Sequence, residues 1–413
     1  MTTGAELRGT IDELAQAGGV RECLRWFTRE KQWVNERHLE VCRIPAPTFQ
    51  ERQRAEWMAE QFQAMGCQAH LDAAGNLVAR LEPEEDPDQP LIALTAHLDT
   101  VLAPRNKEDI AVDPDGVLRG PGVADNGAGL AALLAMAQAL KSSPPLEETR
   151  SALLLVATVG EEGEGNLTGM RHLVQESLLG ARIRTYVVLE GAGTDRIIHQ
   201  AVASRRLEVA FTGPGGHSWS DPGTPNPIHA LGRAIALFTD QCGRTAGESP
   251  RCSCHFGVVE GGWSVNAIPN LARGKVDLRS EDDRKIEQML ELLEASVERA
   301  LEIENQRATA GKLAARIKDI GARPGGRLDE NAPLLAALRA VDAHLGLRPR
   351  LECSSTDANI PLAAGRPALA LGAGGRGGGM HTPGEWFHPQ GRDLGLKRIV
   401  LLLAWALQEQ HLP

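Results

Sequence analysis

The sequence predicts a protein of the α/β class that carries an inserted domain of the α+β class. Short apolar runs alternate with helical stretches in both end segments of the chain, and this alternation is typical of α/β folds. Between about residues 204 and 321, the predicted strands instead alternate polar and apolar residues, as in a sheet with one face in water. The length of 413 residues corresponds to about two to three ordinary domains.

The N-terminal segment is expected to be helical and to lead into the first strands of the sheet. Leu24, Phe27 and Val34 recur at helical spacings, and a second helical pattern follows Pro47 and runs to Gly66. The next apolar runs predict strands at residues 75–81, 91–95, 152–159 and 186–189, with a helix at residues 128–140.

The pattern changes at about Ser204 and returns to its earlier style at about Asp329. Inside the insert we expect strands at residues 206–212, 253–259, 271–278 and 312–320, with helices at 227–239 and 281–304. After it we expect a helix to Leu345 and a strand at residues 367–371. The simplest organisation is a discontinuous domain of residues 1–203 and 322–413, interrupted by an inserted domain of residues 204–321.

Composition and charge exclude several classes of protein. Hydrophobic residues at 42% and charged residues at 24% are close to the averages of globular proteins, which excludes disordered and collagen-like chains. A formal charge of -10 provides no basic surface for nucleic acid or for an anionic membrane. The first 20 residues lack the apolar core of a signal peptide, and no apolar run has the length of a membrane span. We therefore expect a cytoplasmic protein.

The seven cysteines are an odd number scattered over a long chain, which favours reduced and mostly buried thiols. Cys252 and Cys254 form a C-x-C pair, but no second pair accompanies it, so a zinc knuckle is not expected.

Ionisable side chains follow four of the predicted apolar strands. In open α/β sheets ligands bind beyond the carboxyl ends of the strands, where the connecting loops splay apart. The residues at these positions are His97 and Asp99, Glu161 and Glu162, Glu190, and His381. A further acid, Asp125, lies in a glycine-rich turn just before the helix predicted at residues 128–140. Because unpaired charge beside an apolar wall is costly, this set needs a counter-ion.

A divalent metal is the counter-ion that fits. Two imidazoles with several carboxylates suit zinc, with manganese or cobalt as possible occupants. Five ligand groups exceed what one catalytic zinc normally uses, whereas two metals about 3.5 to 4 Å apart and bridged by one carboxylate would use them all.

With these residues in place, the sequence resembles the M20 metallopeptidases, a family that includes glutamate carboxypeptidase, aminoacylase, desuccinylases and peptidase T. The resemblance covers nearly the whole chain. The motifs that carry it are Thr95-Ala-His97-Leu-Asp99, Gly120-Pro-Gly-Val-Ala-Asp125-Asn-Gly, Gly160-Glu161-Glu162-Gly, Leu189-Glu190-Gly, Gly215-Gly-His217-Ser and Met380-His381-Thr-Pro-Gly-Glu385. It implies a mixed-sheet, zinc-exopeptidase-like catalytic domain with an inserted dimerisation or lid domain.

The resemblance also implies roles for individual residues. Asp125 bridges two metals; His97 and Glu190 complete one site, and Glu162 and His381 complete the other. Asp99 would not touch metal; lying two residues beyond His97 on the same side of a strand, it could accept that imidazole's second N–H.

Catalysis would depend on the acid next to a ligand. By this resemblance, Glu161 is the general base and acid. It would take a proton from water acidified by the cations and return that proton to the leaving amine.

The insert would contribute further site residues. The resemblance makes this domain the homodimer contact and brings His217 to the partner's active site, where it stabilises the oxyanion. Asn266 and Arg279 match positions that contact the substrate carboxylate in carboxypeptidase-like members, a task that suits the bidentate fork of Arg. The sequence departs from many relatives at Asn126, where they carry a Lys or a second acid after the bridging Asp.

The resemblance predicts a dinuclear zinc hydrolase that cleaves a small peptide or an N-acyl amino acid. Glu190 favours a deacylase or carboxypeptidase, because aminopeptidase-like members tend to have Asp there. Two alternatives stay open: an aminopeptidase acting on di- or tripeptides, and a dimeric binding protein that has lost catalysis. The substrate's identity and the native metal are left open by the sequence.

Overall fold

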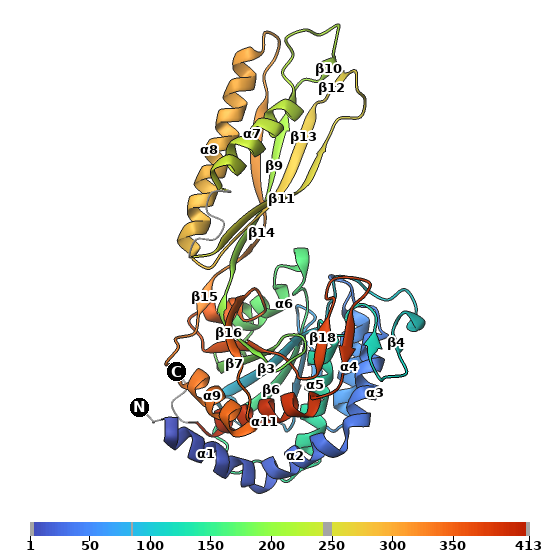
Figure 1. The fold of residues 1–413 in the computed structure, drawn as a ribbon, viewed down its shortest axis with the longest axis vertical. Helices are drawn as coiled ribbons and strands as arrows, with labels where there is room; N and C mark the ends of the chain where they lie inside the picture. Colours follow the sequence, from blue (N-terminus) through green and yellow to red (C-terminus); the bar gives the residue numbers. More distant parts are fainter. Residues whose placement is uncertain (1–3, 84–85, 243–249, 410–413) are drawn as a thin grey trace. The chain divides into compact units, whose positions relative to one another are not determined.

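The computed structural model describes residues 4–83, 86–242 and 250–409, and these divide into two compact units. Unit 1 comprises residues 1–201 and 326–413, and unit 2 comprises residues 202–325 (Figure 1). The division lies two residues before and four residues after the boundaries expected from the sequence. The predicted α/β class with a mixed sheet is confirmed for unit 1.

Unit 1 is built on a mixed sheet in the order β1-β2-β6-β3-β7-β17-β8-β15, with β16 also paired to β8. The strands are β1 Gln68–Leu71, β2 Leu77–Arg80, β3 Leu91–His97, β6 Ala152–Thr158, β7 Ile183–Leu189, β8 Arg196–Ala201, β15 Gly326–Arg327, β16 Arg350–Ser354 and β17 Ala368–Leu371. All seven residues of β3 are buried, because helices cover both faces of the sheet at its centre. A small second sheet joins β18 Arg376–Gly378, β19 Trp386–His388, β5 Leu118–Arg119 and β4 Ala111–Val112.

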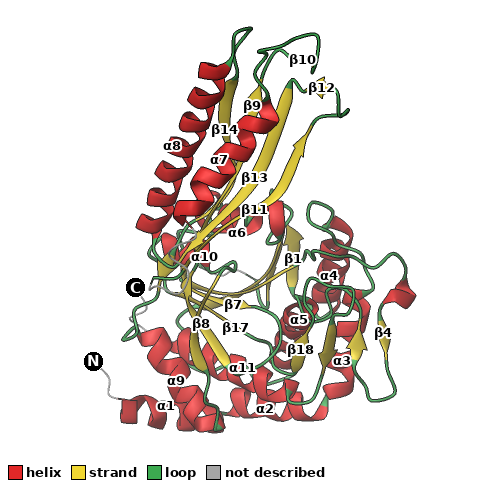
Figure 2. Ribbon diagram, turned by 45° about the horizontal axis from the view of Figure 1, so that its top comes forward, coloured by secondary structure: helices red, strands yellow, loops and turns green. Residues whose placement is uncertain are grey.

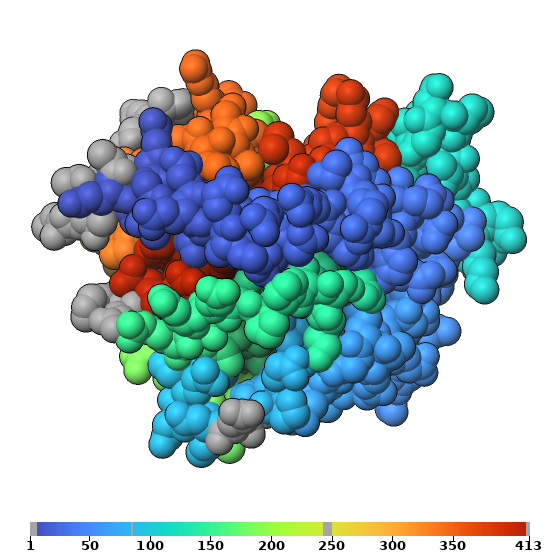
Figure 3. Space-filling view, turned by 90° about the horizontal axis from the view of Figure 1, so that it is seen from below, coloured from blue at the N-terminus to red at the C-terminus, as the bar shows by residue number. Residues whose placement is uncertain are grey.

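Helices surround this sheet and share one apolar core with it. They are α1 Gly4–Gln16, α2 Gly18–Arg29, α3 Lys31–Cys42, α4 Arg52–Ala64, α5 Gly127–Lys141, α6 Thr168–Arg171, α9 Pro333–Leu345, α10 Asn359–Ala363 and α11 Arg392–Gln408. The first helices form an outer band across one face of unit 1 (dark blue, Figure 3). Ile11 and Phe27 are buried there, and Asp12 pairs with His344 of α9 at 2.6 Å. The N-terminal extension therefore closes the core of unit 1.

Unit 2 is a four-stranded antiparallel sheet in the order β11-β13-β9-β14, with helices α7 and α8 on one face (Figure 2). Its elements are β9 Ala203–Thr212, α7 Pro227–Cys242, β11 Cys252–Gly261, β13 Leu271–Ser280, α8 Asp283–Arg307 and β14 Ala314–Arg323, with the short pair β10 Gly216–His217 and β12 Ala267–Ile268. Along β9, Leu207, Val209 and Phe211 are buried in the core, whereas the residues between them are only half-buried. The alternation read from the sequence thus corresponds to a sheet with one face turned away from the core.

No helix within the described ranges is both long and apolar enough to cross a bilayer. The cytoplasmic location stays a prediction.

Candidate metal centre

Three parallel strands of unit 1 deliver the predicted ligands to one edge of the sheet. Strands β6, β3, β7 and β17 are neighbours in that order, and every adjacent pair among them is parallel. His97 is the last residue of β3, Glu162 follows β6, and Glu190 follows β7. Because the carboxyl ends of parallel strands meet at the same edge, these side chains converge although they are far apart in sequence.

Asp125 lies at the centre of the cluster, between the two histidines. Its Oδ1 is 3.0 Å from His97 Nε2, and its Oδ2 is 3.2 Å from His381 Nε2. On one side, Glu190 Oε1 lies 3.7 Å from His97 Nε2. On the other, Glu162 Oε1 lies 3.0 Å from His381 Nε2. The five groups thus form two sets that share one carboxylate, in the pairing that the resemblance implies.

The surroundings of His97 call for positive charge on its ring or beside it. Its Nδ1 lies 2.9 Å from the backbone oxygen of Asp99, which can only accept, so Nδ1 carries the hydrogen. In the neutral ring, Nε2 then presents a lone pair to Asp125 and Glu190, whose oxygens are acceptors too. Either the ring takes a second proton or a metal ion lies among these atoms.

The charges of the cluster are strongly coupled. Burial alone would lower the pKa of the His97 imidazole, but its contacts with Asp125, Asp99 and Glu190 outweigh burial and raise that pKa well above its ordinary value. For Glu190, burial is the main cause that raises the pKa to about 7, and the neighbouring carboxylates of Asp125 and Glu162 add to it. Hydrogen bonds to Asp125 and Glu162 raise the pKa of His381 to about 10. The carboxylates of the cluster therefore strongly favour positive charge beside them.

The donor set fits divalent metal ions. Zinc binds His nitrogen and carboxylate oxygen at about 2.0–2.2 Å, so that two ligands of one tetrahedral ion lie about 3.3–3.6 Å apart. The measured separations of 3.0 to 3.7 Å lie on either side of this value. His97, Asp125 and Glu162 each offer a ligand atom within 4.8 Å of the others. The Oε2 atom of Glu190 is buried without a hydrogen-bond partner, as expected for an oxygen that a metal would bind.

Asp99 orients the strand end that carries the two adjacent glutamates. Its Oδ1 and Oδ2 accept the backbone N–H groups of Glu161 and Glu162, each at 2.9 Å, and Oδ2 also accepts the hydroxyl of Thr48 at 2.9 Å. The 2.9 Å contact with His97 is made by the backbone oxygen of Asp99, while its carboxylate lies at 3.6 Å, because that carboxylate is engaged by the two N–H groups. Glu161 is buried and immediately precedes the ligand position Glu162.

The structure gives positioning roles to Glu385, which the sequence placed only within the His381 motif, and to Asn126, which it marked only as a departure from many relatives. The carboxylate of Glu385 accepts the backbone N–H groups of Gly122, Ala124 and Asp125 at 2.7 to 2.9 Å. Since Glu385 follows His381 in the same loop, it ties the loop of one ligand to the loop of the bridging ligand. The available signal was an acid four residues after His381, but its targets are backbone groups more than 250 residues away.

Asn126 performs a similar task on the other side. Its amide donates to the backbone oxygen of Leu189 at 2.8 Å, and its oxygen accepts the N–H groups of Gly191 and Gly129 at 3.2 Å. Asn126 thereby caps helix α5 and holds the backbone on both sides of Glu190. The departure from the family pattern at this position has a structural role that keeps a ligand in place.

We expect Glu385→Gln to weaken metal binding about 10- to 100-fold, the range seen when groups that orient metal ligands are altered. The amide keeps one acceptor oxygen but turns its NH2 group toward at least one N–H that needs an acceptor, so the Asp125 loop is held less firmly. Titration of metal-depleted protein with zinc measures the effect. The control is Glu60→Gln, which makes the same exchange on the exposed side of α4. Equal zinc affinity in both variants would contradict the role of Glu385.

Two of the predicted residues in unit 2 lie together, and the third is distant from them. His217 on β10 pairs with Ala267 of β12, directly after Asn266, and the backbone oxygen of Asn266 accepts the N–H of Ser218. Arg279 pairs with Ser204 at the other end of β13, about 27 Å from Leu271 by the rise of a strand. There its Nε donates to Asp277 at 2.7 Å. One copy of unit 2 therefore does not bring together Asn266 and Arg279, the two residues expected at the substrate carboxylate.

The ring of His217 has a defined tautomer. Its Nδ1 accepts the backbone N–H groups of Trp219 and Ser220 at 3.1 and 3.3 Å. The neutral ring then carries its hydrogen on Nε2, and the side chain is exposed. His217 is thus prepared as a hydrogen-bond donor.

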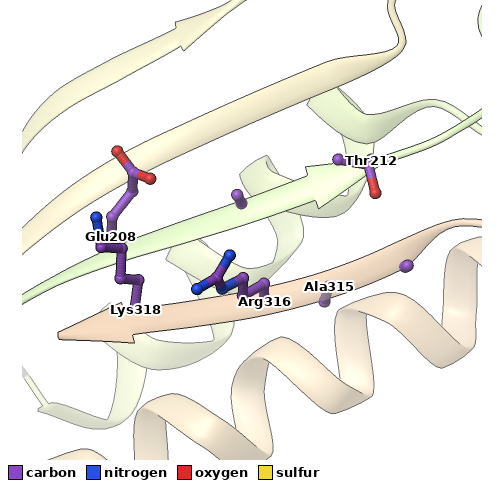
Figure 4. Close-up of a pocket in the computed structure, with 7 residues that line it drawn as sticks. Glu208, Thr212, Ala315, Arg316 and Lys318 are labelled. Atoms are coloured by element: carbon purple, nitrogen blue, oxygen red, sulfur yellow. The ribbon is translucent and has the colours of Figure 1, made fainter.

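A shallow hollow of about 290 Å³ lies on the open face of the unit 2 sheet, over β9 and β14 (Figure 4). Glu208, Arg316 and Lys318 line it together with Thr212 and small alanines. It contains none of the residues that the sequence singled out.

The comparisons agree with the geometry. The sequence profile described as Peptidase family M20/M25/M40 matches residues 93–405. A succinyl-diaminopimelate desuccinylase of Ruegeria pomeroyi is 27% identical over 253 residues, which are 59% of this chain and 63% of that protein. This alignment therefore spans less than two thirds of the relative's length.

Solved structures share the fold. A tripeptidase from Staphylococcus aureus has a TM-score of 0.72 at 20% identity, covering 92% of this chain and 99% of that chain. The YXEP protein of Bacillus subtilis, described as a dinuclear metal binding peptidase from the M20 family, has a TM-score of 0.66 at 14% identity, covering 92% and 99%. The profile match extends over most of the chain and includes the five clustered residues from His97 to His381, which confirms the resemblance seen in the motifs. The chain belongs to peptidase family M20/M25/M40.

Proposed function

We propose that this protein is a dinuclear metal hydrolase that cleaves the amide bond of a small peptide or of an N-acyl amino acid. The observation that carries the proposal is the shared carboxylate of Asp125, which contacts His97 and His381 with its two oxygens. His97 and Glu190 would hold one ion with it, and Glu162 and His381 the other. When bound, such ions supply positive charge that polarises the amide carbonyl and acidifies water.

Glu161 would transfer the protons, and Asp99 and His97 would keep the reacting groups in position. Glu161, buried beside the cluster, takes the proton from the attacking water and returns it to the leaving nitrogen. Asp99 keeps Glu161 and Glu162 in place through their backbone N–H groups. His97 keeps its Nδ1 hydrogen on the Asp99 backbone oxygen, which leaves Nε2 for the ligand role.

The proposed substrate carries a free carboxylate next to the scissile amide, and zinc is the proposed metal, with cobalt or manganese able to replace it. Support comes from Glu190, the position that favours deacylases and carboxypeptidases, and from the similarity to a desuccinylase.

A substrate panel tests this proposal, with metal content measured in the same samples. Peptides blocked at the amino terminus and N-acyl amino acids should be cleaved, whereas peptides blocked at the carboxyl terminus should not. The reverse preference would make the protein an aminopeptidase, and full amidase activity in metal-free protein would end the dinuclear proposal. No cleavage by protein that holds about two metals per chain would favour a binding protein.

We also propose a homodimer formed through unit 2. Strand β11 is an edge strand of its sheet, and Val258 and Val259 on it are exposed at 40% and 60%. An exposed apolar edge strand is a surface prepared for pairing with another chain. Near the β10–β12 pair, Trp219 and Trp263 are exposed at 87% and 68%. A second copy of the chain would cover these side chains and receive His217 and Asn266 at its metal centre.

The dimer predicts complementation between inactive chains. His217→Ala should lower kcat about 10²- to 10³-fold by removing an oxyanion donor. Mixed in equal amounts with Glu161→Gln, it should restore roughly a quarter of wild-type activity, because half of the dimers are mixed and each has one intact site of two. Subunit exchange is verified by mass spectrometry on differently tagged chains. Exchange without recovery of activity would show that His217 serves its own chain.

A further inference from the structure

Three of the seven cysteines gather in unit 2, whereas the five residues of the metal centre belong to unit 1. Cys242 is the last residue of α7, and Cys252 and Cys254 lie on β11. Cys242 belongs to the apolar core of unit 2, and the other two pack against it. All seven cysteines lie in the described part of the chain, and none of them is in a disulfide.

The packing of α7 on β11 explains why the thiols meet. Residues 252, 254 and 256 alternate with more exposed neighbours and therefore share the face of β11 that the helices cover. The rings of Phe238 on α7 and Phe256 on β11 lie 6.1 Å apart in an edge-to-face arrangement. Cys242 is four residues beyond Phe238, about 6 Å along the helix, and Cys254 is two residues before Phe256, about 7 Å along the strand. Cys242 and Cys254 therefore lie next to the Phe238–Phe256 contact, on the same helix–strand interface.

The two thiols are close enough to influence each other, and they differ in exposure. Their mutual contact is the main cause that raises the pKa of the Cys242 thiol and lowers that of Cys254. Cys242 is buried, whereas Cys254 is partly exposed. A small reagent can therefore reach the Cys254 sulfur more easily than the Cys242 sulfur.

We propose that Cys242 and Cys254 are a reversible redox pair that forms a disulfide within the chain, with hydrogen peroxide as the oxidant. The Cys254 thiolate attacks the O–O bond and becomes a sulfenic acid, and the released hydroxide takes up a proton to give water. Cys242 then attacks the sulfenic sulfur and loses its own proton, and a second water leaves as the S–S bond forms. Two thiols are oxidised, one peroxide is reduced to two waters, and a small dithiol reverses the change.

Cys252 provides the matched comparison for this assignment. It lies on the same face of β11, but it is four residues from Phe256, whereas Cys254 is two residues from that ring, which contacts α7. If simple nearness of thiols decided the outcome, Cys252 would compete for the bridge. The geometry of α7 on β11 selects Cys254.

The test is peroxide treatment of the full chain, followed by denaturing alkylation and peptide mapping. We expect a loss of two of the seven alkylatable thiols, a cross-linked peptide that joins Cys242 to Cys254, and full recovery with dithiothreitol. Cys252→Ser should still form the bridge, whereas Cys242→Ala and Cys254→Ser should not. Circular dichroism verifies that each variant is folded. If a variant does not fold, the peptide map of the wild-type protein still tests the proposal.

Other products would overturn the inference. These are retention of all seven thiols, a bridge that includes Cys252, a bridge between two chains, or irreversible oxidation of Cys254 alone. Because the readout is a peptide map and not activity, the result is independent of the function proposed for the metal centre.

Discussion

Glu161→Gln is expected to lower kcat by about 10²- to 10⁴-fold, the range of a general acid and base, while the protein keeps its metals. The amide has nearly the shape of the carboxylate but cannot take a proton from water. The backbone N–H of residue 161 is unchanged, so its hydrogen bond with Asp99 and the position of Glu162 should persist. Steady-state kinetics and metal analysis of the same samples measure both quantities.

Glu164→Gln is the control for this variant. It makes the same exchange three residues further along, at an exposed position, and should leave kcat near the wild-type value. If Glu161→Gln lost metal together with activity, Glu161 would be a ligand or a structural residue. If it kept both, another group would have to move the proton.

Asp125→Ala is expected to have the larger effect on metal content, because both ions lose a ligand at once. We expect metal to fall from about two ions per chain to less than one, and kcat/KM to fall by on the order of 10³-fold or more. His97 and His381 would each lose their contact with the shared carboxylate. Mass-spectrometric metal analysis and kinetics at saturating zinc separate weak binding from absent binding.

Asp115→Ala controls for the loss of an exposed acid in the preceding turn and should keep its metals. Thermal unfolding verifies that the Asp125 variant is folded. A folded Asp125→Ala protein that retains two metals would contradict the bridging role. Loss of only one ion would mean that Asp125 belongs to a single site.

The sequence was sufficient to predict the central strands of the unit 1 sheet. Strands β3, β6 and β7 were expected because their residues are almost all buried, and such runs are visible as apolar stretches. Helix α11 was not predicted. It is buried on nearly every side, so its residues lack the one-sided periodicity that marks an amphipathic helix. Strand β8 was missed as well, since Arg196, His199 and Gln200 leave only a short apolar run in it.

The site also contains residues whose roles the sequence could predict and residues whose roles it could not. The ligand positions could be proposed because acids and histidines that follow apolar strands are unusual in chemical terms. The roles of Glu385 and Asn126 could not, because both act on backbone groups that become neighbours only in the folded chain. Cys242 was left out of the C-x-C pair for the same reason: its distance from Cys254 is set by the packing of a helix on a strand.

The discontinuity of unit 1 has a consequence for biosynthesis. Strand β17 lies between β7 and β8, and His381 follows it, so the sheet and the metal centre both need residues translated near the end of the message. Unit 2 draws on one uninterrupted stretch and can fold as the nascent chain leaves the ribosome. The earlier strands with Asp125 must wait in an unfinished state while some 120 residues of unit 2 emerge. We therefore expect the unfinished sheet of unit 1, and not unit 2, to need chaperone protection during translation.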